Sequence, residues 1–365
     1  MNKLSYKPLL LLIALAGSSC TKDKFDNTDF LKTGTAPADQ AINFNISNDN
    51  SGLVTITPNS AGATAYDIYF GDTPASTSPT HVLPGQNTSH IYKEGTYPVK
   101  VVATGITGLK SETIKQLVVT FRAPESLAIT ANANLHDLTV SASALYATGG
   151  FKVYFGDAAN EVPVLIAEGA SVTHTYASAG KYTVKVEALS GGAASTSTTK
   201  DITIYNALIL PMTFEQTDVN YAWGDFGGSN TTIIPNPYPS GINTSATVGK
   251  IVKTKDQTWA GNYISMSSPL DFTSNKKFKV KVYSFRPGLR VLLQLERSGD
   301  NSFMENVEAV TSTANTWEEL TFDFSSKITD NSKRLQNILF FLDNGTLGDG
   351  SQNYTILFDD IVLTN

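Results

Sequence analysis

The chain has 365 residues, so a typical domain length of about 150 residues predicts two or three domains. Only 16% of the residues are charged and the net charge is −6, which leaves no basic excess to neutralise phosphates and argues against a nucleic-acid partner. A single cysteine excludes a disulfide framework and a cysteine-rich zinc site.

The chain begins with the features of a secretion signal. Two lysines precede a short apolar run at residues 9–16, and small residues then lead to Cys20, the only cysteine. A membrane-spanning helix needs about 20 apolar residues, so the run favours a signal peptide over residues 1–19. A small-residue run that ends at a cysteine resembles a bacterial lipobox, which implies cleavage before Cys20 and its lipidation. The alternative is an ordinary secretion signal with an incidental cysteine.

The segment from residue 20 to 41 is polar and contains glycine and proline, which is typical of a flexible tether.

A repeat follows the tether. Residues 66–72 align with 151–157, and residues 95–101 align with 180–186, at an offset of 85. Apolar and polar residues alternate through these segments, as in a strand with one buried face. The pattern predicts two small antiparallel sandwiches of immunoglobulin-like shape.

The repeated Tyr-Phe-Gly-Asp, His-x-Tyr and Gly-x-Tyr-x-Val-x-Val segments resemble PKD domains, at residues 42–122 and 125–205. The tryptophan usual in that pattern is replaced by Tyr66 and Phe151. The resemblance implies rigid spacers. His90 and His174 occupy equivalent places in separate copies, so they are interpreted as hydrogen-bonding strand residues and not as metal ligands.

The last third, residues 207–365, contains all three tryptophans. Eight or more candidate strands separated by Gly, Pro, Asn and Asp predict a two-sheet jelly roll. The whole chain is therefore expected to be all-β: two tandem sandwiches followed by a jelly-roll module.

The ends of this module carry a second resemblance. An opening Phe-Glu at 214–215 and a closing Asp-Asp-Ile at 359–361 resemble jelly-roll carbohydrate-binding modules such as families four and sixteen. There the two ends meet and share a structural Ca²⁺. The resemblance implies Glu215 and Asp360 as ligands, with backbone carbonyls completing the shell and Asp359 as a neighbour or alternate. The alternative is that the acids face solvent at strand ends.

Strand alternation predicts which side chains face outward. In residues 278–283 and 291–296, one set of alternate residues is apolar and suits the core. The other set is predicted to share one open sheet face and to bind sugar hydroxyls and rings: Lys281, Tyr283, Gln294 and Glu296.

The tryptophans differ in their surroundings. Trp259 lies in a polar, glycine-flanked turn and is predicted to be an exposed platform for a sugar ring. Trp223 lies in a loop and is either a second platform or a plug at the end of the sandwich. Trp317 starts a strand and is predicted to be structural. Asp343 ends a strand, as part of a plain turn or at the rim of the site.

No catalytic motif is found. The Glu-x-Asp-x-x-Glu strand of retaining jelly-roll glucanases, the Gly-x-Ser-x-Gly elbow, the His-Glu-x-x-His helix and the phosphate-binding loop are absent from the sequence. An enzyme is not expected.

The order of these parts resembles the surface glycan-binding lipoproteins of bacterial polysaccharide-utilisation systems. The resemblance implies a lipid-anchored protein of the outer membrane, exposed at the cell surface. It would capture a polysaccharide, a β-1,3-glucan such as laminarin, for neighbouring enzymes and an outer-membrane transporter. Two alternatives stay open: an adhesin with a protein partner, and an accessory subunit of a glycoside hydrolase.

Overall fold

A computed structural model describes residues 29–73 and 78–365. The signal segment, Cys20 and the start of the tether lie outside the described residues. Within them, helix is limited to α1 (Asp29–Lys32) and a short 3₁₀ turn, η1 (Gln352–Tyr354), so the all-β prediction is confirmed. No helix of the described ranges has the length and apolar character needed to cross a membrane. The chain divides into two compact units, one up to Ala123 with the 190–194 loop, and one with the remainder.

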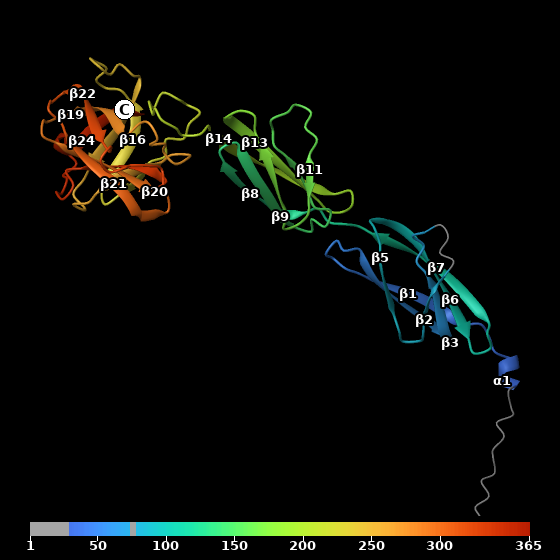
Figure 1. Cartoon of the computed structure of the whole chain (residues 1–365). Helices are drawn as coiled ribbons and strands as arrows, with labels where there is room; N and C mark the ends of the chain where they lie inside the picture. The colour runs from blue at the N-terminus through green and yellow to red at the C-terminus, as the bar shows by residue number, and fades with distance from the viewer. Residues whose placement is uncertain (1–28, 74–77) are drawn as a thin grey trace, which may run out of the picture. The chain divides into compact units, whose positions relative to one another are not determined.

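The first module is a sandwich of two antiparallel sheets (Figure 1), with strand orders β1-β2-β5 and β4-β3-β6-β7. Apolar side chains at alternate positions fill the space between the sheets, as in Val99, Val101 and Ala103 of β6. β1 begins at Ala38, so the tether ends four residues earlier than predicted. The strands are β1 (Ala38–Ile46), β2 (Leu53–Ala61), β3 (Ala63–Tyr69), β4 (Thr80–Val82), β5 (Thr88–Ile91), β6 (Gly95–Gly105) and β7 (Lys110–Val119).

The second module repeats this topology with its own core. Its sheets have the orders β8-β9-β12 and β11-β10-β13-β14, which match those of the first module strand for strand. The structure therefore confirms the repeat seen in the sequence. The strands are β8 (Glu125–Asn134), β9 (Asp137–Leu145), β10 (Phe151–Tyr154), β11 (Val164–Ile166), β12 (Ser171–Thr175), β13 (Gly180–Leu189) and β14 (Ser195–Ile204).

The two equivalent histidines have the structural role that the sequence predicts. The imidazole Nε2 of His90 lies 2.7 Å from Oδ2 of Asp72, and the ring stacks on Phe70 with centroids 4.0 Å apart. In the second module, His174 lies 2.6 Å from Asp157 in the same way. Each histidine thus pairs with an acid of its own module.

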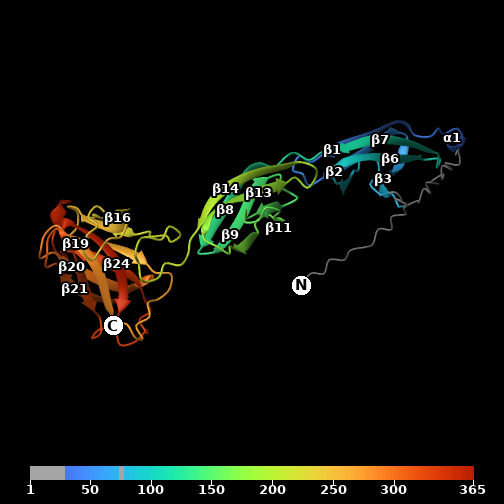
Figure 2. The same cartoon turned by 90° about the horizontal axis from the view of Figure 1, so that it is seen from above.

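The C-terminal module is a sandwich of two five-stranded antiparallel sheets, which Figure 2 shows from above. Sheet I has the order β15-β18-β23-β20-β21 and sheet II the order β16-β17-β24-β19-β22. The strands are β15 (Gly224–Phe226), β16 (Ser229–Pro235), β17 (Thr247–Lys253), β18 (Gly261–Ser265), β19 (Lys277–Ser284), β20 (Arg290–Arg297), β21 (Asp300–Val310), β22 (Thr316–Asp323), β23 (Leu335–Leu342) and β24 (Thr355–Thr364).

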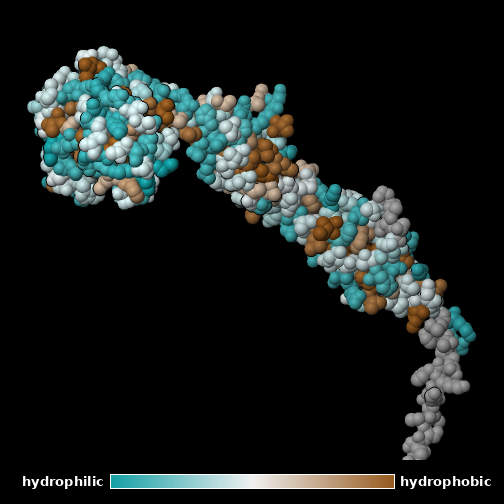
Figure 3. All heavy atoms as spheres, viewed as in Figure 1, coloured by the Kyte–Doolittle hydropathy of each residue, from teal (hydrophilic) through white to brown (hydrophobic). Residues whose placement is uncertain are grey.

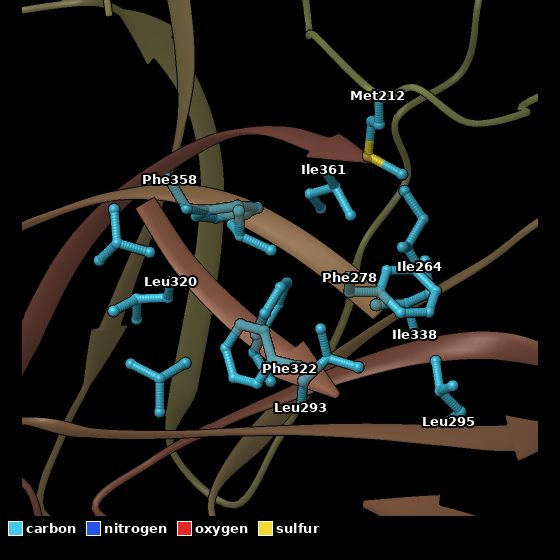
Figure 4. Close-up of a cluster of buried hydrophobic side chains, with 14 of the residues drawn as sticks. Met212, Ile264, Phe278, Leu293, Leu295, Leu320, Phe322, Ile338, Phe358 and Ile361 are labelled. Atoms are coloured by element: carbon cyan, nitrogen blue, oxygen red, sulfur yellow. The ribbon is translucent and has the colours of Figure 1, made fainter. Parts of the chain in front are cut away.

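The core of this module lies between the two sheets. Figure 4 shows Phe278 and Phe322 of sheet II meeting Leu293 and Ile338 of sheet I. The core residues predicted from alternation in β19 and β20 are all fully buried. The opening segment also joins the closing strand, because Met212 and Ile361 exchange two backbone hydrogen bonds of 2.9 Å.

One prediction about the outer faces is wrong. β19 belongs to sheet II and β20 to sheet I, so Lys281 and Tyr283 face outward on the opposite side of the sandwich from Gln294 and Glu296. Alternation within a strand tells which residues point inward, but both sheets of a sandwich have an outer face.

Candidate functional site

A groove of about 550 Å³ lies on the outer face of sheet I. It crosses β15, β18, β23 and β20 and ends at the loop that joins β20 to β21. Its lining combines aromatic rings with amides, hydroxyls and one carboxylate: Phe226, Tyr263, Ser265, Glu296, Ser298, Gly299, Asn301, Asn337, Leu339 and Phe341.

Strand register places the polar and aromatic side chains in adjacent rows. Tyr263 pairs with Leu339, and Leu339 pairs with Gln294. In the next row Asn337 pairs with Glu296. The amide Nε2 of Gln294 donates a hydrogen bond of 2.6 Å to Oε1 of Glu296. The outward position predicted for these two residues is therefore confirmed, and the amide and the acid fix each other beside the aromatic rings.

Two glycines allow aromatic rings to lie against the backbone of the sheet. A Cβ on Gly224 would lie 2.2 Å from the ring of Tyr263 on the neighbouring strand. A Cβ on Gly261 would lie 2.7 Å from Phe226 and 2.8 Å from Phe341. Contacts this short are forbidden, so the rings hold their positions only because both residues lack a side chain.

Trp259 lies beside the β15 end of the groove. Its indole is 53% exposed and stacks on Phe226, with centroids 6.0 Å apart and an angle of 23° between the rings. Phe226 in turn contacts Phe341 edge to face at 5.7 Å. The exposure predicted for Trp259 is confirmed, and its ring continues the aromatic lining of the groove.

Trp223 is not part of this surface. Its ring packs into the core of the sandwich, 5.3 Å from the ring of Phe358 and 6.0 Å from that of Phe340. Its prediction as a sugar platform is wrong, and the alternative of a plug in the sandwich is the one observed.

A loop covers the outer face of sheet II. Tyr238, on the loop between β16 and β17, stacks on Tyr283 with centroids 4.7 Å apart and an angle of 7°. Tyr283 is only 5% exposed, so its prediction as a sugar-binding residue is wrong. The indole Nε1 of Trp317 donates a 2.8 Å hydrogen bond to the carbonyl of Tyr238, which confirms the structural role predicted for Trp317.

Asp343 is also structural. The carboxylate is nearly buried, accepts a 3.1 Å hydrogen bond from the backbone N–H of Arg290, and forms an ion pair with the guanidinium of Arg286. Its placement at the rim of the site is therefore wrong, because both oxygens are already occupied within the fold.

The two acids predicted to bind calcium have separate protein partners. Glu215 is exposed, and its Oε1 accepts hydrogen bonds of 2.8 and 2.9 Å from the backbone N–H and the hydroxyl of Thr247. Asp360 forms an ion pair of 2.5 Å with the ammonium of Lys281. Across residues 29–73 and 78–365, no group of three or more His, Cys, Asp or Glu side chains is placed to hold a metal ion.

Asp359 is predicted to be a neighbour of the calcium ligands or an alternate ligand. In the structure its side chain is fully buried. It accepts a 3.0 Å hydrogen bond from Nδ2 of Asn243 and a 2.8 Å bond from the N–H of Asp360. Burial raises its pKa from 3.8 to about 6, since the charged form is poorly solvated there.

Sequence reasoning missed most of the aromatic lining. Tyr263, Phe341 and Asn337 were not predicted, because β23 is rich in apolar residues on both faces and indicates a buried strand, and β18 has only five residues. The available signal was the pair of strand glycines, which marks places where a neighbouring side chain lies against the backbone.

Comparisons with known proteins give a family match for one module and structural likenesses for larger parts. The PKD domain family matches residues 121–204. No curated protein matches the chain.

Similar solved structures include carbohydrate-binding modules of the β-sandwich superfamily, at 14% identity and a TM-score of 0.31, covering 68% of this chain and 100% of that one. The family 11 carbohydrate-binding module of the cellulase Lic26A-Cel5E of Clostridium thermocellum is 16% identical, with a TM-score of 0.31, over 44% of this chain and 95% of that one. SGBP-B from a complex xyloglucan utilization locus in Bacteroides uniformis is 10% identical, with a TM-score of 0.30, over 91% of this chain and 100% of that one.

Proposed function

We propose that the groove of sheet I binds a polysaccharide chain without cleaving it. The observation that supports this most is the row of contacting rings from Trp259 through Phe226 to Phe341, with Tyr263 in the same groove and the hydrogen-bonded pair of Gln294 and Glu296 beside it. Pyranose rings have apolar faces that pack on aromatic rings and hydroxyls that bond to amides and acids. The groove offers both kinds of group side by side.

The lining supports a neutral glycan as the ligand. Glu296 is its only charged residue, and the other polar groups are amides and hydroxyls. An anionic glycan would bring its charges close to this carboxylate, which is unfavourable in a partly buried groove. A neutral β-glucan, of which laminarin is the β-1,3-linked example, meets no such repulsion and is our proposed ligand.

A binding role without chemistry agrees with the same lining. Hydrolysis of a glycosidic bond needs two carboxyl groups, about 5–10 Å apart, on either side of the bond. Glu296 has no second acid among the lining residues, and it accepts a hydrogen bond from Gln294. We propose that the protein is a capture protein and not a hydrolase.

The proposal extends to where capture takes place. Lipidation of Cys20 would fix the protein to the outer membrane, and the two repeated modules would act as spacers that carry the C-terminal module outward. Several weak contacts to one long glycan raise its local concentration for neighbouring enzymes and a transporter.

Calcium belongs to this proposal as a structural ion. Glu215 and Asp360 are the proposed ligands, with backbone oxygens completing the shell and Asp359 as the neighbour or alternate ligand, where the opening segment joins β24. The ion would compensate the buried negative charge of Asp359.

Affinity electrophoresis of the mature chain through gels that contain single polysaccharides tests the function. Laminarin should retard the wild-type protein, and Tyr263→Ala should greatly reduce the retardation. Tyr238→Ala is the matched control, because Tyr238 is also an exposed ring, 40% exposed against 41% for Tyr263, but lies on the covered face of sheet II. No retardation by any polysaccharide in a broad panel would end the glycan proposal.

A protein partner is the second candidate. The face of the C-terminal module in Figure 3 is mostly hydrophilic, with separate apolar spots and no broad apolar patch. On the second module, however, Val162, Val164 and Leu165 are exposed around the edge strand β11. If no polysaccharide binds to the protein, this edge is the surface to test for binding of a protein partner.

A further inference from the structure

A fully buried lysine, Lys253, lies behind the loop that holds Trp259. Lys253 ends β17, at the point where the chain leaves sheet II for the loop of residues 254–260. Its side chain is completely buried, which is rare for a lysine because its ammonium is strongly hydrated in water.

Three backbone carbonyls take the place of the water that would otherwise hydrate the ammonium of Lys253. The ammonium Nζ of Lys253 donates hydrogen bonds to the carbonyls of Thr258 at 2.9 Å, Leu342 at 2.8 Å and Asp343 at 3.3 Å. All three donors of the ammonium are used; the carbonyls of Thr258 and Asp343 lie in loops, and that of Leu342 lies at the end of β23. One buried cation therefore joins the loop before β18 to the end of β23.

The neighbouring loop completes the junction. The N–H of Gly345 donates a 3.1 Å hydrogen bond to the carbonyl of Thr258, the same oxygen that Lys253 contacts. A Cβ on Gly348 would lie 2.2 Å from the carbonyl oxygen of Lys253 and 2.7 Å from its Cγ, so the missing side chain makes room for both the backbone and the stem of this lysine. Thr258, the residue directly before Trp259, is thus held by two donors from separate elements.

The same loop is also tied to the turn that follows β15. The N–H of Gln257 donates to the carbonyl of Gly227 at 3.0 Å, and the N–H of Thr254 donates to that of Gly228 at 2.8 Å. Trp259 itself has one stacking partner, Phe226, and is 53% exposed. The orientation of its indole therefore depends also on the backbone on either side of it. Lys253 holds that backbone through its hydrogen bond to the carbonyl of Thr258.

We propose that Lys253 is a positioning residue, whose ammonium holds the 254–260 loop in the shape that presents the Trp259 indole at the end of the groove. The consequence for glycan affinity rests on the proposed function, whereas the consequence for the loop does not. The two parts can be measured separately.

The experiment is fluorine NMR of the mature chain labelled with 5-fluorotryptophan. The chain has three tryptophans, and Trp259→Phe assigns the resonance of Trp259. Lys253→Met should move or broaden this resonance and leave those of Trp223 and Trp317 in place, since these two lie in packed regions away from the loop. The dissociation constant for laminarin should rise at least tenfold.

Lys250→Met is the matched control. Lys250 lies on the same strand, three residues earlier and half-buried, and its substitution should leave all three resonances and the affinity unchanged. If Lys253→Met does not fold, Lys253→Gln keeps an N–H donor on a shorter stem and should still displace the Trp259 resonance. An unmoved Trp259 resonance in a folded variant overturns the proposal. A displaced resonance with unchanged laminarin affinity supports the positioning role and contradicts the part of Trp259 in glycan binding.

Discussion

The indole of Trp259 lies stacked on the ring of Phe226, with centroids 6.0 Å apart and ring planes within 23°. This contact joins a loop residue to a strand residue and extends the aromatic lining of the sheet I groove beyond its edge. The contact with Phe226 orients the Trp259 indole, while the other face of the indole stays exposed and can stack on a sugar ring.

Trp259→Ala should remove most of the glycan affinity while the fold stays intact. An exposed aromatic platform at a binding site commonly contributes 2 kcal/mol or more, so we expect a loss of about 30-fold in affinity. Isothermal titration calorimetry with laminarin measures the loss, and the melting temperature should change by less than about 2 °C. A variant that unfolds would place Trp259 in the core instead.

Trp223→Ala should have the opposite pattern. Its ring packs on Phe340 and Phe358, so truncation leaves a cavity in the sandwich and should cost about 3 kcal/mol of unfolding free energy. Chemical denaturation checks this value. At denaturant concentrations below the unfolding transition, the folded protein should bind laminarin with wild-type affinity. A loss of affinity without a loss of stability would show instead that Trp223 takes part in binding.

Gly224→Ala should weaken binding through Tyr263. The new methyl group would lie 2.2 Å from the tyrosine ring and must displace it. We expect the affinity to fall about as far as in Tyr263→Ala, and the double variant to lose nothing further, since both changes remove the same ring. Calorimetry on the three variants decides this. Fully additive losses would show that Gly224 acts independently of Tyr263.

Burial of Asp359 predicts an unusual pH dependence in the presence of chelator. Its pKa is about 6 in the folded protein and 3.8 in the unfolded chain, so the folded state favours the protonated acid. This contribution is complete below about pH 3.8 and is lost as the pH rises through about 6. At 1.36 kcal/mol per unit, the loss is on the order of 3 kcal/mol.

Urea denaturation between pH 4.5 and 7.5 tests the pH dependence of Asp359. Asp359→Asn should flatten the curve, because the amide cannot ionise. A wild-type curve that rises over this range and stays unchanged in Asp359→Asn would contradict the assignment.

Calcium should restore the unfolding free energy that is lost when Asp359 ionises. If the ion binds at Glu215 and Asp360 with Asp359 as neighbour or alternate ligand, millimolar CaCl₂ should raise the melting temperature at pH 7.5 and have much less effect at pH 5, where Asp359 is protonated. Scanning calorimetry measures both. A melting temperature indifferent to calcium and to chelator at pH 7.5 would remove the calcium site.

The sequence predicts the fold well and the site only in part. Period-two alternation is set by local geometry, so the core residues of β19 and β20 and the repeated modules could be identified from the sequence alone. The pairing of strands is not local. Tyr283 and Gln294 have equally good alternation, and only the assignment of β19 and β20 to different sheets separates them.

The aromatic residues show the same limit. Trp259 could be recognised because its neighbours are polar, whereas Trp223 has similar neighbours in the sequence and packs against Phe358, which is 135 residues away in the chain. Phe341 lies on a strand with apolar residues on both faces, and Tyr263 lies on a strand of only five residues, so the groove that they line depends on which strands pair with theirs.

Calorimetric titration of laminarin oligosaccharides into the mature wild-type chain and into the Trp259→Ala/Tyr263→Ala double variant tests the central claim most directly. The account predicts saturable binding of about one oligosaccharide per chain to the wild type and none to the folded double variant. Equal binding by the two proteins would contradict it, because the glycan would then be held elsewhere than on the aromatic surface of sheet I.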